Sequence, residues 1–230
     1  MSLLPSKAKE KIQANLPVLA INPFAGGFDI AEIISRQGVD ILFIDCERAG
    51  IAIETVGPMA RAAQYHGVSA VVRSKSRQVE EWVSILDRGV DGIVIPRVET
   101  AKDARIILET VHYATGARAK NIIIIPQIES ELGMTNLESI LDVKGFDLFL
   151  IGPYDLSHSM GFGGDINVPE VQNALDYIAK TILKHGEKFG LPITLANAKT
   201  WQAKGAIFNF HSLEALIKPS LELIKKEIGC

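Results

Sequence analysis

Two runs of aliphatic residues end abruptly in an acid, and they are the most informative part of the chain. The first, IIIIPQIES at residues 122–130, carries Glu129, and the second, LFLIGPYDLS at residues 148–157, carries Asp155. Continuous apolar runs of this length are typical of strands buried on both faces. Each acid therefore stands at the carboxyl end of a core strand, where α/β folds place their chemistry. Two carboxylates on neighbouring strand ends repel each other unless a cation lies between them, so the pattern predicts a divalent metal site.

Other polar residues follow the remaining core strands in the same way. They are Asp45, Glu47 and Arg48 after the second strand, Arg73 after the third, Arg97 after the fourth, Gln127 in the fifth, Asn197 after the seventh and His211 after the eighth. Taken alone, each could equally satisfy loop backbone groups or pair with a neighbour. Together they suit an anionic substrate chelated to a cation, because an arginine fork matches a carboxylate while a metal polarises an adjacent carbonyl.

The other residues with possible chemistry have a simpler interpretation. His66, His112 and His185 fall on helical segments, where a packed or solvated histidine is the usual case, whereas His158 follows the Asp155 loop and could line the pocket. Cys46 is interpreted as a small buried filler, because no histidine base lies beside it in sequence. Trp82 and Trp201 are predicted to be core residues.

A degenerate repeat indicates which elements position these residues. RQGVD precedes ILFID, DRGVD precedes GIVIPR, VKGFD precedes LFLIGP and AKG precedes AIFNF, so a glycine ends each amphipathic segment before an aliphatic strand begins. The predicted strands are residues 17–23, 41–45, 69–73, 92–97, 122–128, 148–153, 192–197 and 205–210, and the clearest predicted helices are 31–37, 79–89, 101–114 and 169–190. Eight alternating units predict an α/β fold of the (β/α)8 TIM-barrel type. An open doubly wound sheet is the alternative, but the chain lacks GxGxxG.

The last units of the chain are irregular. Only AKTWQAK, residues 198–204, separates the last two strands, which is too short for a full covering helix. The segment 212–229 contains Pro219, so we expect it to kink or split there. A barrel that is short of covering helices exposes apolar strand surface. We therefore expect a homo-oligomer.

Composition excludes several classes of protein. With 230 residues, 47% of them hydrophobic, the chain is expected to form a single domain over residues 1–230. A net charge of -3 with scattered Lys and Arg predicts no nucleic-acid partner. The opening segment 1–17 is polar and helical in pattern rather than a signal peptide, and the apolar runs are too short for a membrane span. Two cysteines, Cys46 and Cys230, fit a cytoplasmic protein better than a disulfide scaffold.

The chain resembles the HpcH/HpaI family, the metal-dependent pyruvate aldolases related to the citrate lyase beta subunit. The resemblance covers about residues 17–217 and rests on VDILFIDCERA, AVVRS, ILDRGVDGIVIPRVETAKDAR, PQIES and LIGPYDLSHSMGFGG. It implies a pyruvate-type TIM barrel with a swapped C-terminal helix and a trimeric or hexameric assembly. It also implies that Glu129 and Asp155 bind Mg²⁺ or Mn²⁺.

The resemblance further assigns roles to individual residues. Gln127 and the backbone at Tyr154 would face the pyruvyl group, and Arg73 would stabilise its enolate. Asp45 belongs to the same motif, and Asp87 stands where the family has a supporting acid.

The chain departs from the family pattern at several places. Where family aldolases read D-x-E-H, with the histidine as general base, this chain reads DCER, so Arg48 stands in the catalytic position and cannot accept a proton. A family segment of a few tens of residues is missing after YATGARAK, Tyr154 replaces a small residue, and the final G-x-D reads FHSLEAL.

The sequence thus predicts a class II aldehyde-lyase that acts on a 2-oxo acid through a pyruvate enolate. Proton transfer would then need a metal-bound water, His158 or Glu47. Two alternatives remain: a binding protein that kept the pocket and lost turnover, and a biosynthetic relative that forms carbon–carbon bonds.

Overall fold

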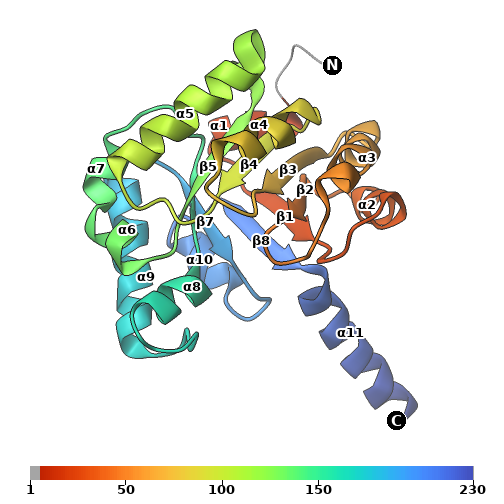
Figure 1. Ribbon diagram of the computed structural model, residues 1–230. Coiled ribbons are helices and arrows are strands. Elements are labelled where there is room, and N and C mark those ends of the chain that lie inside the picture. The colour runs from red at the N-terminus through yellow and green to blue at the C-terminus, as the bar shows by residue number, and fades with distance from the viewer. Residues whose placement is uncertain (1–5, 230) are drawn as a thin grey trace.

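Eight parallel strands form a closed barrel in the order of the chain (Figure 1). The computed structural model describes residues 6–229. The strands are β1 (Val18–Asn22), β2 (Ile41–Asp45), β3 (Ser69–Arg73), β4 (Gly92–Ile95), β5 (Ile123–Ile128), β6 (Phe149–Ile151), β7 (Phe189–Pro192) and β8 (Phe208–Ser212). The barrel confirms the (β/α)8 fold that the repeat predicted.

Helices connect successive strands and cover the outside of most of the barrel (Figure 1). They are α1 (Lys7–Gln13), α2 (Phe28–Ser35), α3 (Ile53–Tyr65), α4 (Val79–Asp87), α5 (Ala101–Thr115), the 3-10 helix η1 (Gly116–Asn121), α6 (Glu131–Thr135), α7 (Leu137–Leu141), α8 (Pro153–Ser159), α9 (Pro169–Lys184), α10 (Ala198–Ala203) and α11 (Leu213–Ile228). The helical pattern of the opening segment corresponds to α1, while residues 1–5 of that segment and Cys230 lie outside the described residues.

Side chains alternate between the two faces of every strand and form two apolar layers. The inner layer fills the barrel with residues such as Phe43, Val71, Leu150 and Phe208, and the outer layer packs the strands against the helices. The outer layer includes Trp82 and Trp201, both buried as predicted. Because inward positions recur at every second residue, the inward row of β2 that contains Phe43 ends at Asp45. The same alternation carries Arg73 and Gln127 to the carboxyl rim.

Helix α1 closes the amino end of the barrel. Its Ala8 and Ile12 are buried in the inner layer. Its Lys9 is also buried, and the Nζ atom donates to the carbonyl of Ile122 at 2.6 Å and pairs with Asp147 at 2.9 Å. A buried ammonium needs such partners. Because α1 covers the amino end of the barrel, the carboxyl rim is the end that remains open.

The predicted starts of the last two strands were each wrong by three residues, and β7 also ends five residues before the predicted residue 197. Strand β7 begins at Phe189 and not at residue 192, because the preceding helix ends at Lys184 and Gly186, with φ 75°, turns the chain into the strand. Strand β8 begins at Phe208 because Gly205, with φ 94°, first ends α10. An aliphatic run that adjoins a helix does not show at which residue the hydrogen bonding of the strand begins.

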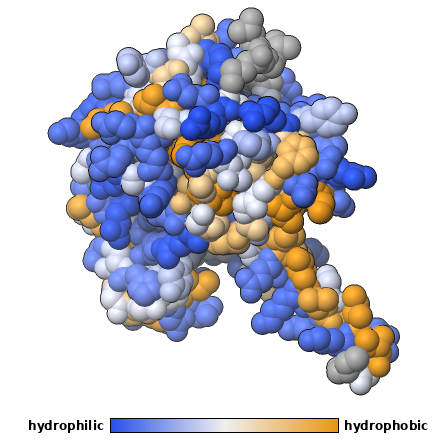
Figure 2. Space-filling view, turned by 45° about the vertical axis from the view of Figure 1, so that its right-hand side comes forward, coloured by the Kyte–Doolittle hydropathy of each residue, from blue (hydrophilic) through white to orange (hydrophobic). Residues whose placement is uncertain are grey.

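The expected break at Pro219 was also wrong in part, because α11 runs from Leu213 to Ile228 as one helix. It projects from the barrel and buries none of its residues (Figure 1). Apolar side chains run along the projecting helix (Figure 2). An exposed helix tolerates an internal proline more easily, since water can satisfy the carbonyl left without a donor.

None of the helices between residues 6 and 229 has the length and apolar character required to cross a membrane.

Candidate functional site

A pocket of about 390 Å³ opens at the carboxyl rim of the barrel. It is lined by Phe24, Phe43, Arg48, Arg73, Gln127, Leu150, Gly152, Pro153, Tyr154, Asp155, Pro192 and Phe210. We call it the central pocket. A second hollow of about 310 Å³, the side pocket, is lined by Glu47, Arg48, Lys75, Ser76, Arg77, Pro96, Arg97, Glu129 and Asp155. Arg48 and Asp155 line both, so the two pockets adjoin at this pair.

The buried carboxylate of Asp45 organises the rim. Asp45 and Arg73 are register partners on β2 and β3, and the guanidinium of Arg73 donates from Nε at 3.0 Å and from Nη2 at 2.6 Å. Asp45 also accepts from Asn22 at 3.1 Å and from the backbone N–H groups of Glu47 and Arg48 at 3.0 and 3.2 Å. Its lone pairs are thus fully used, and Asp45 holds the loop that carries Glu47 and Arg48.

Arg73 keeps its charge in this environment. Burial works against the guanidinium, but the hydrogen bonds and charge of Asp45, together with Glu47 and Glu129, raise the pKa of Arg73 above its ordinary value. Its Nη1 atom lies 3.1 Å from Glu47. Three of the five N–H groups of the guanidinium are therefore engaged, and the rest can meet a ligand in the central pocket.

Glu129 is buried at the end of β5. Gln127 donates to its Oε2 at 2.5 Å, and the backbone N–H of Arg97 donates to its Oε1 at 2.8 Å. Arg97 has φ 52°, a conformation that is uncommon for residues other than glycine and that directs this N–H at the carboxylate. Gly152 leaves the space for the pair, since a Cβ there would lie 2.7 Å from Glu129 Oε2.

Negative charge is concentrated at this point of the rim. Burial, followed by the charges of Glu47 and Asp155, raises the pKa of Glu129 to about 7. The pKa of Glu47 is also raised, first by burial and then by Asp45 and Asp155, although Arg73 and Arg48 oppose the change. Neighbouring negative charges thus oppose the ionisation of Glu129 and Glu47, and the site would be stabilised by an additional cation.

Asp155 lies in the first turn of α8, and its present counter-ion is Arg48. The guanidinium of Arg48 also lies over the ring of Tyr154, at 5.9 Å from its centroid. Arg48 is half-exposed and can move without unpacking the core. The residue that replaces the family histidine is therefore placed against one of the two predicted metal ligands.

The residues fit a small oxygen-binding cation. Gln127 Oε1 and Glu47 Oε2 are buried, and neither accepts a hydrogen bond from residues 6–229, although Glu47 Oε2 forms an ion pair with Arg73 Nη1 at 3.1 Å. Within those residues no group of three or more His, Cys, Asp or Glu side chains is arranged to hold a metal. The ion would therefore take Glu129 and Asp155 from the protein and its other ligands from water or substrate, as Mg²⁺ commonly does.

Several predicted residues do not reach the central pocket. Asp87 is exposed at the end of α4, just before the chain enters the amino end of β4, so it could reach a carboxyl-rim site only in another subunit. Asn197 caps its own loop by accepting from Thr194 N–H at 2.8 Å. His211 points outward from β8 into a surface groove with Asn209 and Asp40, because the inward position beside it is Phe210. His158 packs edge-on against Tyr154, with ring centroids 4.7 Å apart, and lines neither pocket.

The remaining histidines and Cys46 lie away from the two pockets. His112 lies on α5, and His66 and His185 cap the ends of α3 and α9. Cys46 is buried, and burial, followed by the charges of Glu81 and Asp45, raises the pKa of its thiol to about 11. A thiol of this kind is inert at neutral pH.

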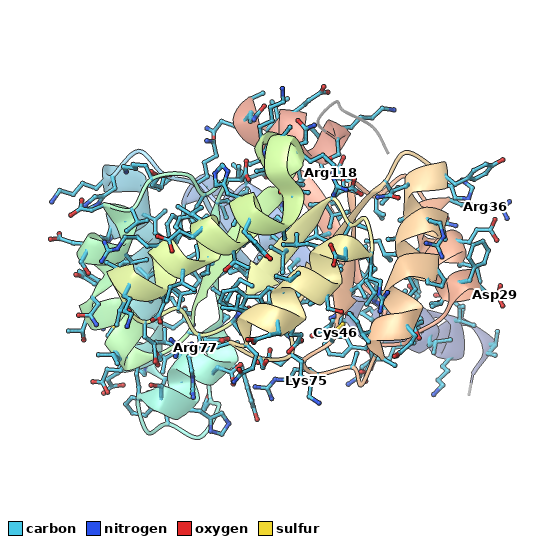
Figure 3. All side chains as sticks on the ribbon, turned by 45° about the horizontal axis from the view of Figure 1, so that its top comes forward. Asp29, Arg36, Cys46, Lys75, Arg77 and Arg118 are labelled. Carbon is cyan, nitrogen blue, oxygen red and sulfur yellow. The ribbon has the colours of Figure 1, made fainter. Side chains whose placement is uncertain are left out.

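Sequence reasoning missed Asn22, although it is a polar residue at the carboxyl end of β1 and the criterion used for the other strands would have found it. It also missed the aromatic residues Phe24, Phe43 and Phe210, since an inward-facing ring cannot be told from core in a sequence. Lys75 and Arg77, on the segment after β3, lie along one edge of the molecule (Figure 3) and line the side pocket. Arg77 is paired with Glu99 at 3.2 Å and with Asp103 at 2.5 Å.

Comparisons with known proteins identify relatives of this chain in sequence and in fold. Residues 26–208 match the family model described as HpcH/HpaI aldolase/citrate lyase. A 4-hydroxy-2-oxo-heptane-1,7-dioate aldolase of Salmonella dublin is 31% identical over 87% of this chain and 85% of its own length. An HpcH/HpaI aldolase/citrate lyase family protein from Burkholderia cenocepacia J2315 superposes with a TM-score of 0.89, at 23% identity, over 96% of this chain and 98% of the other. The citrate synthase SbnG gives a TM-score of 0.84 at 24% identity, over 96% and 98% of the two chains. The last two likenesses concern the fold.

We predict that Asp45→Ala lowers the free energy of unfolding by about 3–5 kcal/mol, because it leaves Arg73 buried without its partner. The double variant Asp45→Leu/Arg73→Leu should cost less than Asp45→Ala alone. Chemical denaturation measures both. Asp176→Ala, which removes the partly exposed ion pair with Lys204, is the control and should cost about 1 kcal/mol or less. An Asp45→Ala variant as stable as this control would contradict the role given to Asp45.

Proposed function

The chain belongs to the HpcH/HpaI aldolase/citrate lyase family, and we propose that it is a divalent-metal-dependent carbon–carbon lyase that cleaves a 4-hydroxy-2-oxo acid. Membership confirms the resemblance carried by PQIES and LIGPYDLS. In the proposed reaction the bond between C3 and C4 breaks and the C4 hydroxyl loses its proton to become an aldehyde. The electron pair remains in the enolate of pyruvate, which then takes a proton at C3.

The observation that carries the proposal is the convergence of Glu129, Asp155, Gln127 and Arg73 at one end of the barrel. Glu129 and Asp155 would hold Mg²⁺ or Mn²⁺, and such an ion supplies Lewis-acid polarisation of the 2-oxo group. Arg73 faces the same pocket with free N–H groups and stabilises the negative charge that develops on the substrate. Gln127 orients the 2-oxo acid.

Proton transfer needs a group other than Arg48, which stays protonated at any working pH. Glu47 is the acid best suited to it, because its pKa is raised and its buried Oε2, although ion-paired with Arg73, accepts no hydrogen bond from the described residues. It lines the side pocket beside Arg48. Asp45 is unsuitable because its oxygens are fully engaged.

The relatives leave the direction and the partner open. One relative is named for the cleavage of a heptane-dioate and a structural neighbour is named a citrate synthase, so bond formation is an alternative for this chain. A binding protein without turnover is the second candidate, and the ion pair of Arg48 with Asp155 favours it.

The scarcity of cysteines in the sequence supports a location in the cytoplasm.

We also propose a homo-oligomer, a trimer or a hexamer, in which a second subunit covers α11. The helix buries none of its residues, and its apolar stripe of Leu213, Ile217, Leu221, Ile224 and Ile228 recurs on one face. The last four of these side chains are 45–67% exposed. In such an oligomer, Asp87 of one subunit could reach the carboxyl rim of the next subunit, which it cannot reach in its own.

We predict that the protein binds Mn²⁺ and that Glu129→Gln and Asp155→Asn each weaken binding at least roughly tenfold. Calorimetry measures the affinity, and the deuterium exchange of pyruvate C3, followed by NMR, should stop when the metal is chelated. Glu131→Gln, an exposed acid on α6, is the matched control. Wild-type protein that binds no divalent metal would overturn the metal site, and metal binding without C3 exchange would favour the binding protein.

For Arg48 we predict that Arg48→His raises the rate of aldol cleavage, because the imidazole can accept a proton. General-base help is typically worth about 10²–10⁴-fold, so partial restoration is measurable as pyruvate release. Arg36→His, at the exposed end of α2 on a different edge of the molecule (Figure 3), serves as control. Robust wild-type cleavage that falls in Arg48→His would show that Arg48 is a working part of a different mechanism.

The oligomer is tested with Leu221→Glu/Ile224→Glu, which places two charges on the apolar stripe of α11. Light scattering after size exclusion should give a trimer or hexamer for the wild type and a smaller species for the variant. Lys226→Glu changes the opposite face of α11 and should leave the assembly intact. A wild-type monomer would contradict the proposal.

A further inference from the structure

The central pocket has two unlike halves. Arg48, Arg73, Gln127 and Asp155 form a polar half, where the proposed function places the 2-oxo acid group. The other half is apolar and is formed by Phe24, Phe43, Leu150, Pro153, Tyr154, Pro192 and Phe210. The volume of about 390 Å³ falls in the range of about 300–1,000 Å³ that is usual for ligands larger than pyruvate. The apolar half is therefore available to the rest of the substrate.

The aromatic ring of Phe24 is held at the mouth of the pocket by a strained backbone. Phe24 has φ 51°, which is rare for a bulky residue. Its N–H donates to Asn22 Oδ1 at 2.8 Å, and Asn22 is itself tied to Asp45 at 3.1 Å. The position of Phe24 thus depends on the polar network of the rim, although its side chain remains 42% exposed.

Tyr154 is held on another side of the pocket by a close approach to glycine. Gly164 has φ 90°, and a Cβ there would lie 2.4 Å from Tyr154 Cε2. The ring also packs against His158 and under the guanidinium of Arg48. Like Phe24, it is about half exposed, at 53%. Two rings are therefore fixed beside the pocket with apolar surface left in water.

The floor of the apolar half is also formed by aromatic rings. Phe43 and Phe210 meet edge to face with centroids 4.8 Å apart, and the guanidinium of Arg73 lies 5.9 Å from the centre of the Phe43 ring. The cations of this pocket, Arg73 and Arg48, are already matched by Asp45, Glu47 and Asp155. A second carboxylate on the substrate would thus meet rings here, with Arg48 as a partner only after a metal has displaced it from Asp155.

We propose that the substrate carries an apolar, preferably aromatic, group on C4, and that Phe24 and Tyr154 determine this specificity. The inference rests on the proposed lyase function. Ring-to-ring contacts would bind the released aldehyde between Phe24, Tyr154 and Phe210. A carboxylate-bearing aldehyde would instead need the side pocket, where Lys75 has no ion pair within the part of the chain that the structure describes.

Pyruvate release from two substrates tests the proposal: 4-hydroxy-2-oxo-4-phenylbutanoate, which yields benzaldehyde, and 4-hydroxy-2-oxoheptane-1,7-dioate. We expect the wild type to have the higher kcat/KM for the phenyl substrate. Tyr154→Ala and Phe24→Ala should each lower that preference roughly tenfold, mainly through KM, while Tyr154→Phe should retain it. Lys75→Ala should leave the preference unchanged.

Three outcomes would overturn the inference. One is a preference of the wild type for the dioate that is lost in Lys75→Ala, which would place the far end of the substrate in the side pocket. Another is an unchanged preference in both alanine variants together with a changed oligomeric state, which would make the rings an interface. The third is wild-type C3 exchange with no preference between the substrates. Absence of C3 exchange with every divalent metal would instead overturn the proposed function itself.

Discussion

The buried pair of Asp45 and Arg73 is the interaction on which the rest of the rim depends. The two residues are opposite each other in the register of β2 and β3, so closing the barrel brings a carboxylate and a guanidinium together in a buried position. Each would be costly to bury alone. The pairing leaves Asp45 oxygens for Asn22 and for the loop after β2. One charge pair therefore joins the first three strands and positions Phe24, Glu47 and Arg48 around the pocket.

The charges at the rim are the physical basis of the proposed cation site. Burial, followed by the charges of Glu47 and Asp155, raises the pKa of Glu129 to about 7, and burial with the charges of Asp45 and Asp155 raises the pKa of Glu47. Arg73 is committed to Asp45 and Glu47, which leaves Arg48 as the counter-ion of Asp155. Arg48 and a metal would compete for the same carboxylate. The replacement of the family histidine thus bears on metal binding as well as on proton transfer.

The same barrel geometry leaves two surfaces open. On the outside of β8 and β1 the short α10 leaves a shallow groove that contains Asn209 and His211, and α11 extends away instead of covering it (Figure 1). An apolar stripe that is exposed on a projecting helix costs free energy in water, and the proposed neighbouring subunit would remove that cost by covering it. At the rim, Phe24 and Tyr154 expose apolar surface next to the pocket, where a substrate can cover it.

The sequence by itself determined the barrel and pointed to Glu129 and Asp155 as the proposed metal ligands, because both follow from local patterns: aliphatic runs of strand length, glycine-ended helices and acids at or shortly after the end of a strand. Glu129, Gln127 and Arg73 lie at the carboxyl rim, where the sequence pattern placed them, since strand alternation carries them inward. Only the tertiary structure decided which strand ends face the pocket. His211 is one residue out of phase with Phe210 and points outward, Asn197 caps a loop because β7 ends earlier than its aliphatic run, and Asp87 lies at the far end of its helix. The partnership of Arg48 with Asp155 joins residues 107 positions apart. Only closure of the barrel brings such residues together, and no local pattern records it.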